Sequence, residues 1–156
     1  MKKLLLAATA ALAFYFLPFF ACAQSTYKTA AGLEIDFGRG RTLAGPTLKN
    51  FFNNSNALQV EALLGSNYFS LGAFYQYHLS IKKASALKFY LGAGPEIYAG
   101  LRNDAGVLLR PMAGFDYKVT KLPLSITFDL RPSLLLGSSS EFEVNRFGLA
   151  ARYAFR

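Results

Sequence analysis

The chain has 156 residues, a hydrophobic content of 53% and a formal net charge of +8. Its one cysteine, Cys22, lies in the N-terminal apolar segment, so the rest of the chain has no disulfide and no thiolate metal site. Beyond Lys82-Lys83 the strand-forming part of the chain has no basic run, and its charges are spread singly. This pattern excludes a nucleic-acid-binding role, which needs a basic patch or stripe.

Residues 1–23 predict a cleaved signal peptide. Lys2 and Lys3 form its positive end, an apolar stretch follows, and Ala21-Cys22-Ala23 is a small-x-small cleavage site. An alternative is lipoprotein processing at Cys22, although the two phenylalanines just before this site suit a lipobox poorly. Removing 23 of the 156 residues leaves 133, which form one domain over 24–156 with 15 basic and 9 acidic residues.

The remainder of the chain alternates apolar and polar residues in eight segments, with polar turns between them. No apolar run approaches the roughly 20 residues that a transmembrane helix needs, whereas a transmembrane strand needs about 9–11 alternating residues. The predicted strands cover residues 27–37, 42–52, 57–64, 68–79, 87–99, 107–119, 122–136 and 142–155.

The first four strands follow this alternation with one weak member. The first carries Glu34 and Asp36 on its polar face. The second is the weakest, because Pro46 cannot donate a hydrogen bond to the ladder. The third carries Glu61 and the fourth His78, the only histidine, on the polar face. We expect His78 to be a hydrogen-bonded interior residue.

The last four strands keep the same parity. The fifth places Glu96 on its polar face, the sixth Arg110 and the seventh Arg131. The eighth shows the pattern best, because Phe147 to Phe155 puts large apolar residues at odd positions and Arg152 at an even one.

Every charge in the strand cores falls on the polar face. A charge that faces lipid at the bilayer midplane costs about 2–4 kcal/mol, so this exclusion indicates lipid on the apolar side. The sequence therefore predicts an all-β fold, a closed antiparallel up-and-down transmembrane β-barrel of eight strands with a polar lumen filled by side chains. The predicted lumen ion-pair network comprises Lys28, Glu34, Asp36, Lys49, Glu61, Lys88, Glu96, Arg110, Asp116, Lys118, Asp129, Arg131, Arg146 and Arg152.

Aromatic residues on the apolar face lie mostly near strand ends, where aromatic girdles form at the two membrane interfaces. They are Tyr27, Phe37, Phe52, Phe69, Tyr77, Phe89, Tyr117, Tyr153 and Phe155. Cross-strand packing in a soluble sheet is the alternative interpretation of these aromatics.

The even strand count places both termini on the periplasmic side. The inner turns are then 53–56, 81–86 and 120–121, and the outer loops about 38–42, 65–67, 100–106 and 137–141. Arg39, Arg41 and Arg102 lie on these outer loops, which suggests contacts with lipopolysaccharide phosphates.

The signal, the eight short strands and the ending Tyr153-Ala154-Phe155-Arg156 resemble small outer-membrane β-barrels of the OmpA/OmpX type. The segments Gly45–Phe52 and Phe89–Pro95 resemble more specifically the compact barrels of Bacteroidetes-type bacteria. The resemblance implies an assembly signal at Tyr153 and Phe155, read by the outer-membrane insertion machinery. Arg156 after Phe155 departs from a strictly terminal phenylalanine.

The expected function is that of an outer-membrane barrel with a structural or interaction role, as a monomer without open pore, catalytic residues, metal or cofactor. Glu34 and Asp36 share a face as a glycosidase pair would, but salt bridging explains them better. One alternative is a lipid A-modifying enzyme similar to deacylases, in which His78 would be the base. Another is a soluble lipocalin-like carrier, which would have an apolar lumen and a polar exterior.

Overall fold

The computed structural model describes residues 27–38, 40–81, 84–100, 104–136 and 142–155. The predicted signal peptide, the lipidation alternative at Cys22 and the predicted outer loop 137–141 lie outside these residues. Across the described ranges, no helix is long and apolar enough to cross a membrane.

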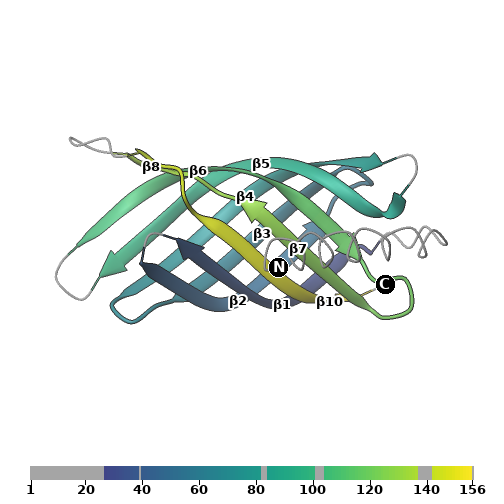
Figure 1. The fold of residues 1–156 in the computed structure, drawn as a ribbon, viewed down its shortest axis with the longest axis horizontal. Coiled ribbons are helices and arrows are strands. Elements are labelled where there is room, and N and C mark those ends of the chain that lie inside the picture. The colour runs from purple at the N-terminus through teal and green to yellow at the C-terminus, as the bar shows by residue number, and fades with distance from the viewer. Residues whose placement is uncertain (1–26, 39, 82–83, 101–103, 137–141, 156) are drawn as a thin grey trace, which may run out of the picture.

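The described residues form ten strands. They are β1 (Thr29–Gly38), β2 (Arg41–Phe51), β3 (Asn56–Leu64), β4 (Tyr68–Ile81), β5 (Ala84–Gly100), β6 (Ala105–Lys118), β7 (Leu124–Leu130), β8 (Ser133–Leu136), β9 (Phe142–Glu143) and β10 (Phe147–Phe155). The antiparallel order β5-β4-β3-β2-β1-β10-β7-β6 closes through pairing of β5 with β6. β8 continues β7 along β6, and β9 precedes β10, so the barrel has eight strands, as predicted. Figure 1 shows them tilted across the long axis of the molecule.

The break between β7 and β8 has a cause in the sequence. The register of β6 with β7 and with β8 is the same on both sides of the break, which sets Pro132 opposite Pro111. Neither proline has an N–H to donate, so the ladder lapses where they face each other. The predicted seventh strand, 122–136, is therefore interrupted rather than continuous.

A β-bulge separates β9 from β10. Three residues, 144–146, lie between these strands, whereas two residues, 131–132, lie between their partners β8 and β7. The extra residue leaves Val144 and Asn145 exposed, while Arg146 is buried. Arg146 donates its backbone N–H to Val144 and accepts at its carbonyl from Arg131 N–H, both at 2.9 Å. Arg146 keeps the inward parity of β10, whereas the extra residue shifts the parity of β9 by one.

The strand β2 is continuous despite Pro46. It pairs with β1 from Arg41 to Asn50, but its pairing with β3 skips Gly45 and Pro46 and resumes at Thr47. The predicted weakness of the second strand is therefore confined to its pairing with β3. The following turn is ordered by Asn53, whose side-chain oxygen accepts from the backbone N–H groups of Ser55 and Asn56.

The barrel is apolar outside and polar inside. Outward residues are exposed hydrophobics, among them Leu33 at 68% and Leu64 at 62%, while inward residues such as Arg110 and Arg152 are buried to 1% or less. Exposed and buried residues alternate strictly from Phe69 to Leu79 in β4 and from Gly148 to Phe155 in β10. This polarity is opposite to that of a lipocalin-like carrier, so that alternative is wrong.

One predicted girdle residue lies inside instead. Tyr27 precedes β1 and is buried, because its hydroxyl donates to Asp116 across the lumen at 2.7 Å. Outside the ladder, the alternation of a strand no longer sets the direction of a side chain. The other predicted girdle aromatics are exposed or half-buried.

Candidate functional site

The candidate site is the charged lumen, and eleven of the fourteen residues predicted for it are buried inside the barrel. They are Glu34, Asp36, Lys49, Glu61, Glu96, Arg110, Asp116, Asp129, Arg131, Arg146 and Arg152. Each makes at least one ion pair with another buried residue. Nine of them lie in strands, in which every second side chain points to the barrel axis, while Arg131 and Arg146 lie in the breaks between β7 and β8 and between β9 and β10.

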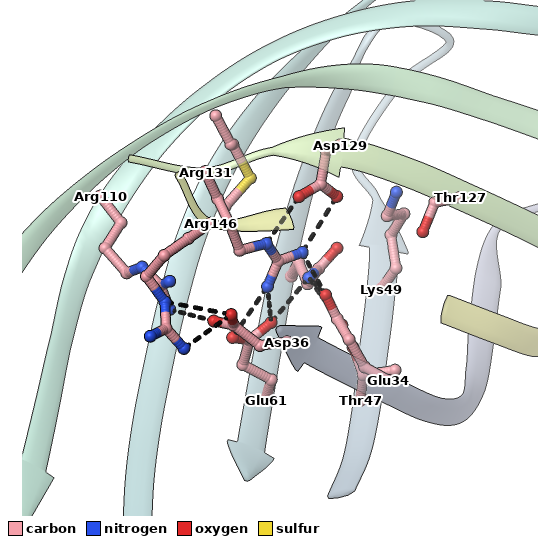
Figure 2. Close-up of polar contacts among 12 residues, drawn as sticks. Glu34, Asp36, Thr47, Lys49, Glu61, Arg110, Thr127, Asp129, Arg131 and Arg146 are labelled. Carbon is pink, nitrogen blue, oxygen red and sulfur yellow. Dashed lines mark hydrogen bonds and ion pairs between the residues drawn. The ribbon is translucent and has the colours of Figure 1, made fainter. Parts of the chain in front are cut away.

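Arg131 is the centre of the network. Its guanidinium binds Asp129 at 2.6 Å, Glu61 at 3.2 Å and also Glu34, so that one fully buried cation joins three strands. Figure 2 shows this guanidinium between Asp129 on one side and Glu34 and Glu61 on the other. Arginine suits this position because its planar donors serve several carboxylates at once.

Arg131 also requires a small neighbour on the adjacent strand. A Cβ added to Gly148 would come within 2.3–2.4 Å of three guanidinium atoms of Arg131. No real Cβ contact is that short, so the arginine lies flat against the backbone of β10 because residue 148 has no side chain.

Arg152 extends the central cluster toward β2 and β7. It binds Glu34 at 2.7 Å and donates to the hydroxyls of Thr47 at 3.0 Å and Thr127 at 2.9 Å. Glu34 therefore receives two arginines, one from β7–β8 and one from β10. Because each buried charge needs a partner and satisfied hydrogen bonds, Glu34 is the carboxylate that holds both cations in place.

A second cluster lies toward the end of the barrel that carries Gly40 and residues 65–67, here called the loop end. Asp36 binds Arg110 at 2.6 Å and Arg146 at 2.8 Å, and Arg110 also binds Glu96. Arg146 approaches Glu143 to 4.0 Å. Figure 2 shows both arginines reaching toward Asp36. Gly40 has φ 75°, a left-handed conformation that glycine adopts without strain.

A third cluster lies toward the opposite end, which carries residues 52–55 and 119–123 and is called the turn end. Asp116 accepts from Lys49 at 3.2 Å, Tyr27 at 2.7 Å and Ser125 at 2.7 Å. His78 Nε2 lies 3.5 Å from the same carboxylate. The hydroxyl of Ser125 is among these donors to Asp116. Both His78 nitrogens lack a hydrogen-bond partner within the described ranges. His78 is buried inside the barrel, as predicted, but the hydrogen bonds that we expected for its ring are not found among the described residues.

The three remaining lysines of the predicted network lie at the turn end rather than in the lumen core. Lys28 precedes β1 and is exposed, which corrects its placement in the lumen. Lys88 is half-buried and donates to the carbonyl of Asn54 at 3.0 Å. Lys118 is half-buried and donates to the carbonyl of Leu122 at 2.6 Å. Long lysine side chains at a barrel rim reach turn carbonyls and water more easily than the packed interior.

The predicted outer-loop arginines have different outcomes. Arg39 and Arg102 lie outside the described residues. Arg41 begins β2 with inward parity, and its guanidinium lies over the ring of Tyr68, 4.6 Å from its centre. The two aromatic residues of the predicted assembly signal, Tyr153 and Phe155, are exposed on the exterior of the barrel.

Uncharged side chains complete the network and were missing from the predicted set. Gln59 donates to Glu34 at 3.0 Å and to Glu61 at 2.9 Å, and Gln76 donates to Gln59 at 2.9 Å. Tyr90 donates to Asp129. Their inward parity was visible in the sequence, but nothing in the alternation distinguishes a bonded lumen amide from a solvated one.

The described residues hold no group of three or more His, Cys, Asp or Glu side chains that could bind a metal ion. The arrangement is instead one of paired opposite charges, with five buried cations and six buried carboxylates among the described residues. Such pairing nearly balances the formal charges of the lumen and crosslinks strands that are not adjacent in the sheet.

The fold is similar to those of known outer-membrane proteins. The N-terminal β-barrel domain of Pseudomonas aeruginosa OprF aligns with a TM-score of 0.64 at 15% identity, over 83% of this chain and 100% of that chain. Neisserial surface protein A (NspA) aligns with a TM-score of 0.54 at 18% identity, over 81% of this chain and 94% of that chain. No protein-family model and no curated protein matches the sequence. At these identities the likeness concerns the fold, and the chain therefore has the fold of the small eight-stranded outer-membrane β-barrels of the OmpA/OmpX type.

Proposed function

We propose that the protein is an integral outer-membrane protein whose filled barrel has a structural or interaction role, without an open pore and without catalysis. The observation that carries this proposal is the polarity of the closed barrel. Most large apolar side chains of the strands, such as Leu33, Phe115 and Leu149, face outward and are exposed, and the ion pairs lie within. In the closed ring of the described strands β1 to β7 and β10, each strand pairs with a neighbour on both sides, which is the condition for a sheet to span a bilayer.

The location is tested with the purified protein after refolding in detergent micelles. We expect compact, heat-modifiable migration on a gel, and aggregation when detergent is left out, because water would then contact the apolar belt. In cells that express the full chain, the protein should fractionate with the outer membrane. A protein that stays monomeric and soluble without detergent would refute the membrane proposal.

The absence of a pore is supported by the packing at the middle of the barrel. The side chains of Lys49, Gln59, Gln76, Arg131 and Arg152 are all 0% exposed. An eight-stranded barrel is only wide enough for its own side chains to fill. Reconstitution in planar lipid bilayers should therefore give no steady conductance steps, and reproducible steps would contradict the filled lumen.

Lipopolysaccharide is the partner proposed for the loop end, on the basis of Arg39, Arg41 and Arg102 in the sequence. Replacing all three with alanine should lower the amount of lipopolysaccharide that co-purifies. The matched control is Lys121→Ala, which removes an exposed cation at the turn end. Equal amounts of co-purified lipopolysaccharide in the triple variant and the wild type would refute lipopolysaccharide as the partner.

The insertion machinery is the partner proposed for the end of β10. Phe155→Ala should slow assembly in cells, because Phe155 is exposed on the exterior near the C-terminus. Phe52→Ala removes another exposed phenylalanine from the turn end and serves as the control. Equal assembly rates for the two variants would argue against a special role for the terminal aromatic.

A further inference from the structure

The loop end of the barrel contains a cavity of about 260 Å³. Inward-facing residues of β2, β4, β5, β6, β8 and β9 line it, and its walls include Tyr68, Tyr98 and Leu108. The volume is slightly below the roughly 300–1,000 Å³ of typical small-molecule pockets. An occupant would therefore be small and would meet both apolar and polar walls.

Two lining residues carry buried donors that have no acceptor. Arg110 is 1% exposed, and its Nη1 binds Asp36 and Glu96. Its Nε and Nη2 have no hydrogen-bond partner in the described part of the chain, and the same is true of Ser70 Oγ. Buried donors left unpaired are costly, so these three atoms indicate an acceptor that the described residues do not supply.

The geometry of the unpaired donors selects the class of acceptor. The Nε and Nη2 atoms form one edge of the planar guanidinium, and their parallel N–H groups match the two oxygens of a carboxylate. The surrounding charges are balanced, with Arg41, Arg110 and Arg146 against Asp36, Glu96 and Glu143. A singly charged group suits this balance better than a doubly charged phosphate, because each added negative charge meets three carboxylates nearby.

We propose that this cavity binds a small organic acid. Its carboxylate accepts from Nε and Nη2 of Arg110, Ser70 supplies a further donor, and a compact apolar or aromatic body packs against Tyr68 and Tyr98. The site lies inside the barrel wall, so it is separate from the lipid-facing surface and goes beyond the proposed structural role.

The test is a titration of ¹⁵N-labelled wild-type protein in detergent micelles, observed at the arginine side-chain Nε–H signals. Benzoate should shift the Arg110 signal with saturation, acetate should do so more weakly, and inorganic phosphate should have less effect than benzoate. Benzyl alcohol, which has the same ring without the carboxylate, should leave the signal in place. No saturable shift with benzoate, or an equal shift with benzyl alcohol, would overturn the proposal. A shift that only lipid A-doped micelles produce would also overturn it, because the donors would then belong to a lipid headgroup.

A variant pair tests the guanidinium edge itself. Arg110→Lys keeps a cation for Asp36 and Glu96 but removes the edge, so benzoate should bind at least about tenfold more weakly. The control is Arg152→Lys, the same change at a buried arginine that does not line the cavity, and its affinity should stay within about twofold of the wild type. Heat-modifiable migration verifies that each variant is folded. Equal weakening in both variants would mean that general charge, rather than this edge, attracts the acid. If Arg110→Lys does not fold, the wild-type titration with benzoate and benzyl alcohol still decides the question.

Discussion

Replacing Arg131 with methionine tests directly whether the lumen network stabilises the barrel. Arg131 is fully buried and binds Glu34, Glu61 and Asp129. Methionine fills much of the same space but carries no charge. In the variant Glu34 keeps Arg152 as its cation, whereas the other two carboxylates lose theirs.

The expected loss follows from those two carboxylates. Within the described ranges, Glu61 keeps the amide of Gln59 and Asp129 keeps the hydroxyl of Tyr90, which are neutral donors. Removing one partner of a buried ion pair costs about 3–5 kcal/mol, because a charge then lies buried without compensation. We therefore expect Arg131→Met to lower the free energy of unfolding by about 4 kcal/mol at neutral pH.

The assay is urea unfolding of the protein in lipid vesicles, with the free energy obtained by linear extrapolation. The matched variant adds Glu61→Gln and Asp129→Asn to Arg131→Met, which removes the uncompensated charges at nearly constant volume. It should recover at least about 2 kcal/mol relative to Arg131→Met. A single variant that loses less than about 1 kcal/mol would mean that the lumen behaves as a hydrated, high-dielectric space. A triple variant no more stable than the single one would assign the loss to packing rather than to charge.

Three further predictions use the same unfolding measurement. Gly148→Ala should lower the free energy of unfolding by about 1–3 kcal/mol, because the added Cβ would overlap the Arg131 guanidinium. The loss should be smaller in the Arg131→Met background, and an unchanged loss there would contradict the overlap. Leu33→Arg, in the middle of β1 on the exterior, should cost about 2–4 kcal/mol in lipid, whereas Phe52→Arg at the turn end should cost about 1 kcal/mol or less. Equal costs at both positions would argue against a membrane around the barrel. Tyr27→Phe should cost about 1–3 kcal/mol through loss of its hydrogen bond to Asp116, while Tyr153→Phe on the exterior should stay within about 0.5 kcal/mol. A Tyr27→Phe variant with an unchanged free energy of unfolding would mean that water replaces the hydroxyl without loss of stability.

Strict alternation made most of the inward set predictable from the sequence. From Phe69 to Leu79 in β4 and from Gly148 to Phe155 in β10, the parity of the residue number alone separates buried from exposed side chains. A slip of one residue in strand pairing would exchange the two faces and bring Arg152 against lipid. Only one of the two faces can therefore point into the barrel.

The prediction failed where the ladder stops or gains a residue. Tyr27 and Lys28 precede β1, so the parity of the strand does not govern them. Extending the parity of β10 back to Glu143 would turn this residue outward, but the bulge at 144–146 places it near Arg146, within 4.0 Å, on the wall of the loop-end cavity. Bulges depend on how two distant strands pair, which a single strand does not reveal.

A barrel with its charges inside was predictable from the alternation of residues, because each side chain's face depends on local parity and on the cost of placing a charge in lipid. Which charges meet depends instead on the three-dimensional arrangement of the strands. Arg131 binds Glu34 across 97 positions of the chain, on strands that are not neighbours in the sheet. That meeting depends on the closure of the barrel and on the heights of the residues along its axis, and the stagger of all eight strands together sets both.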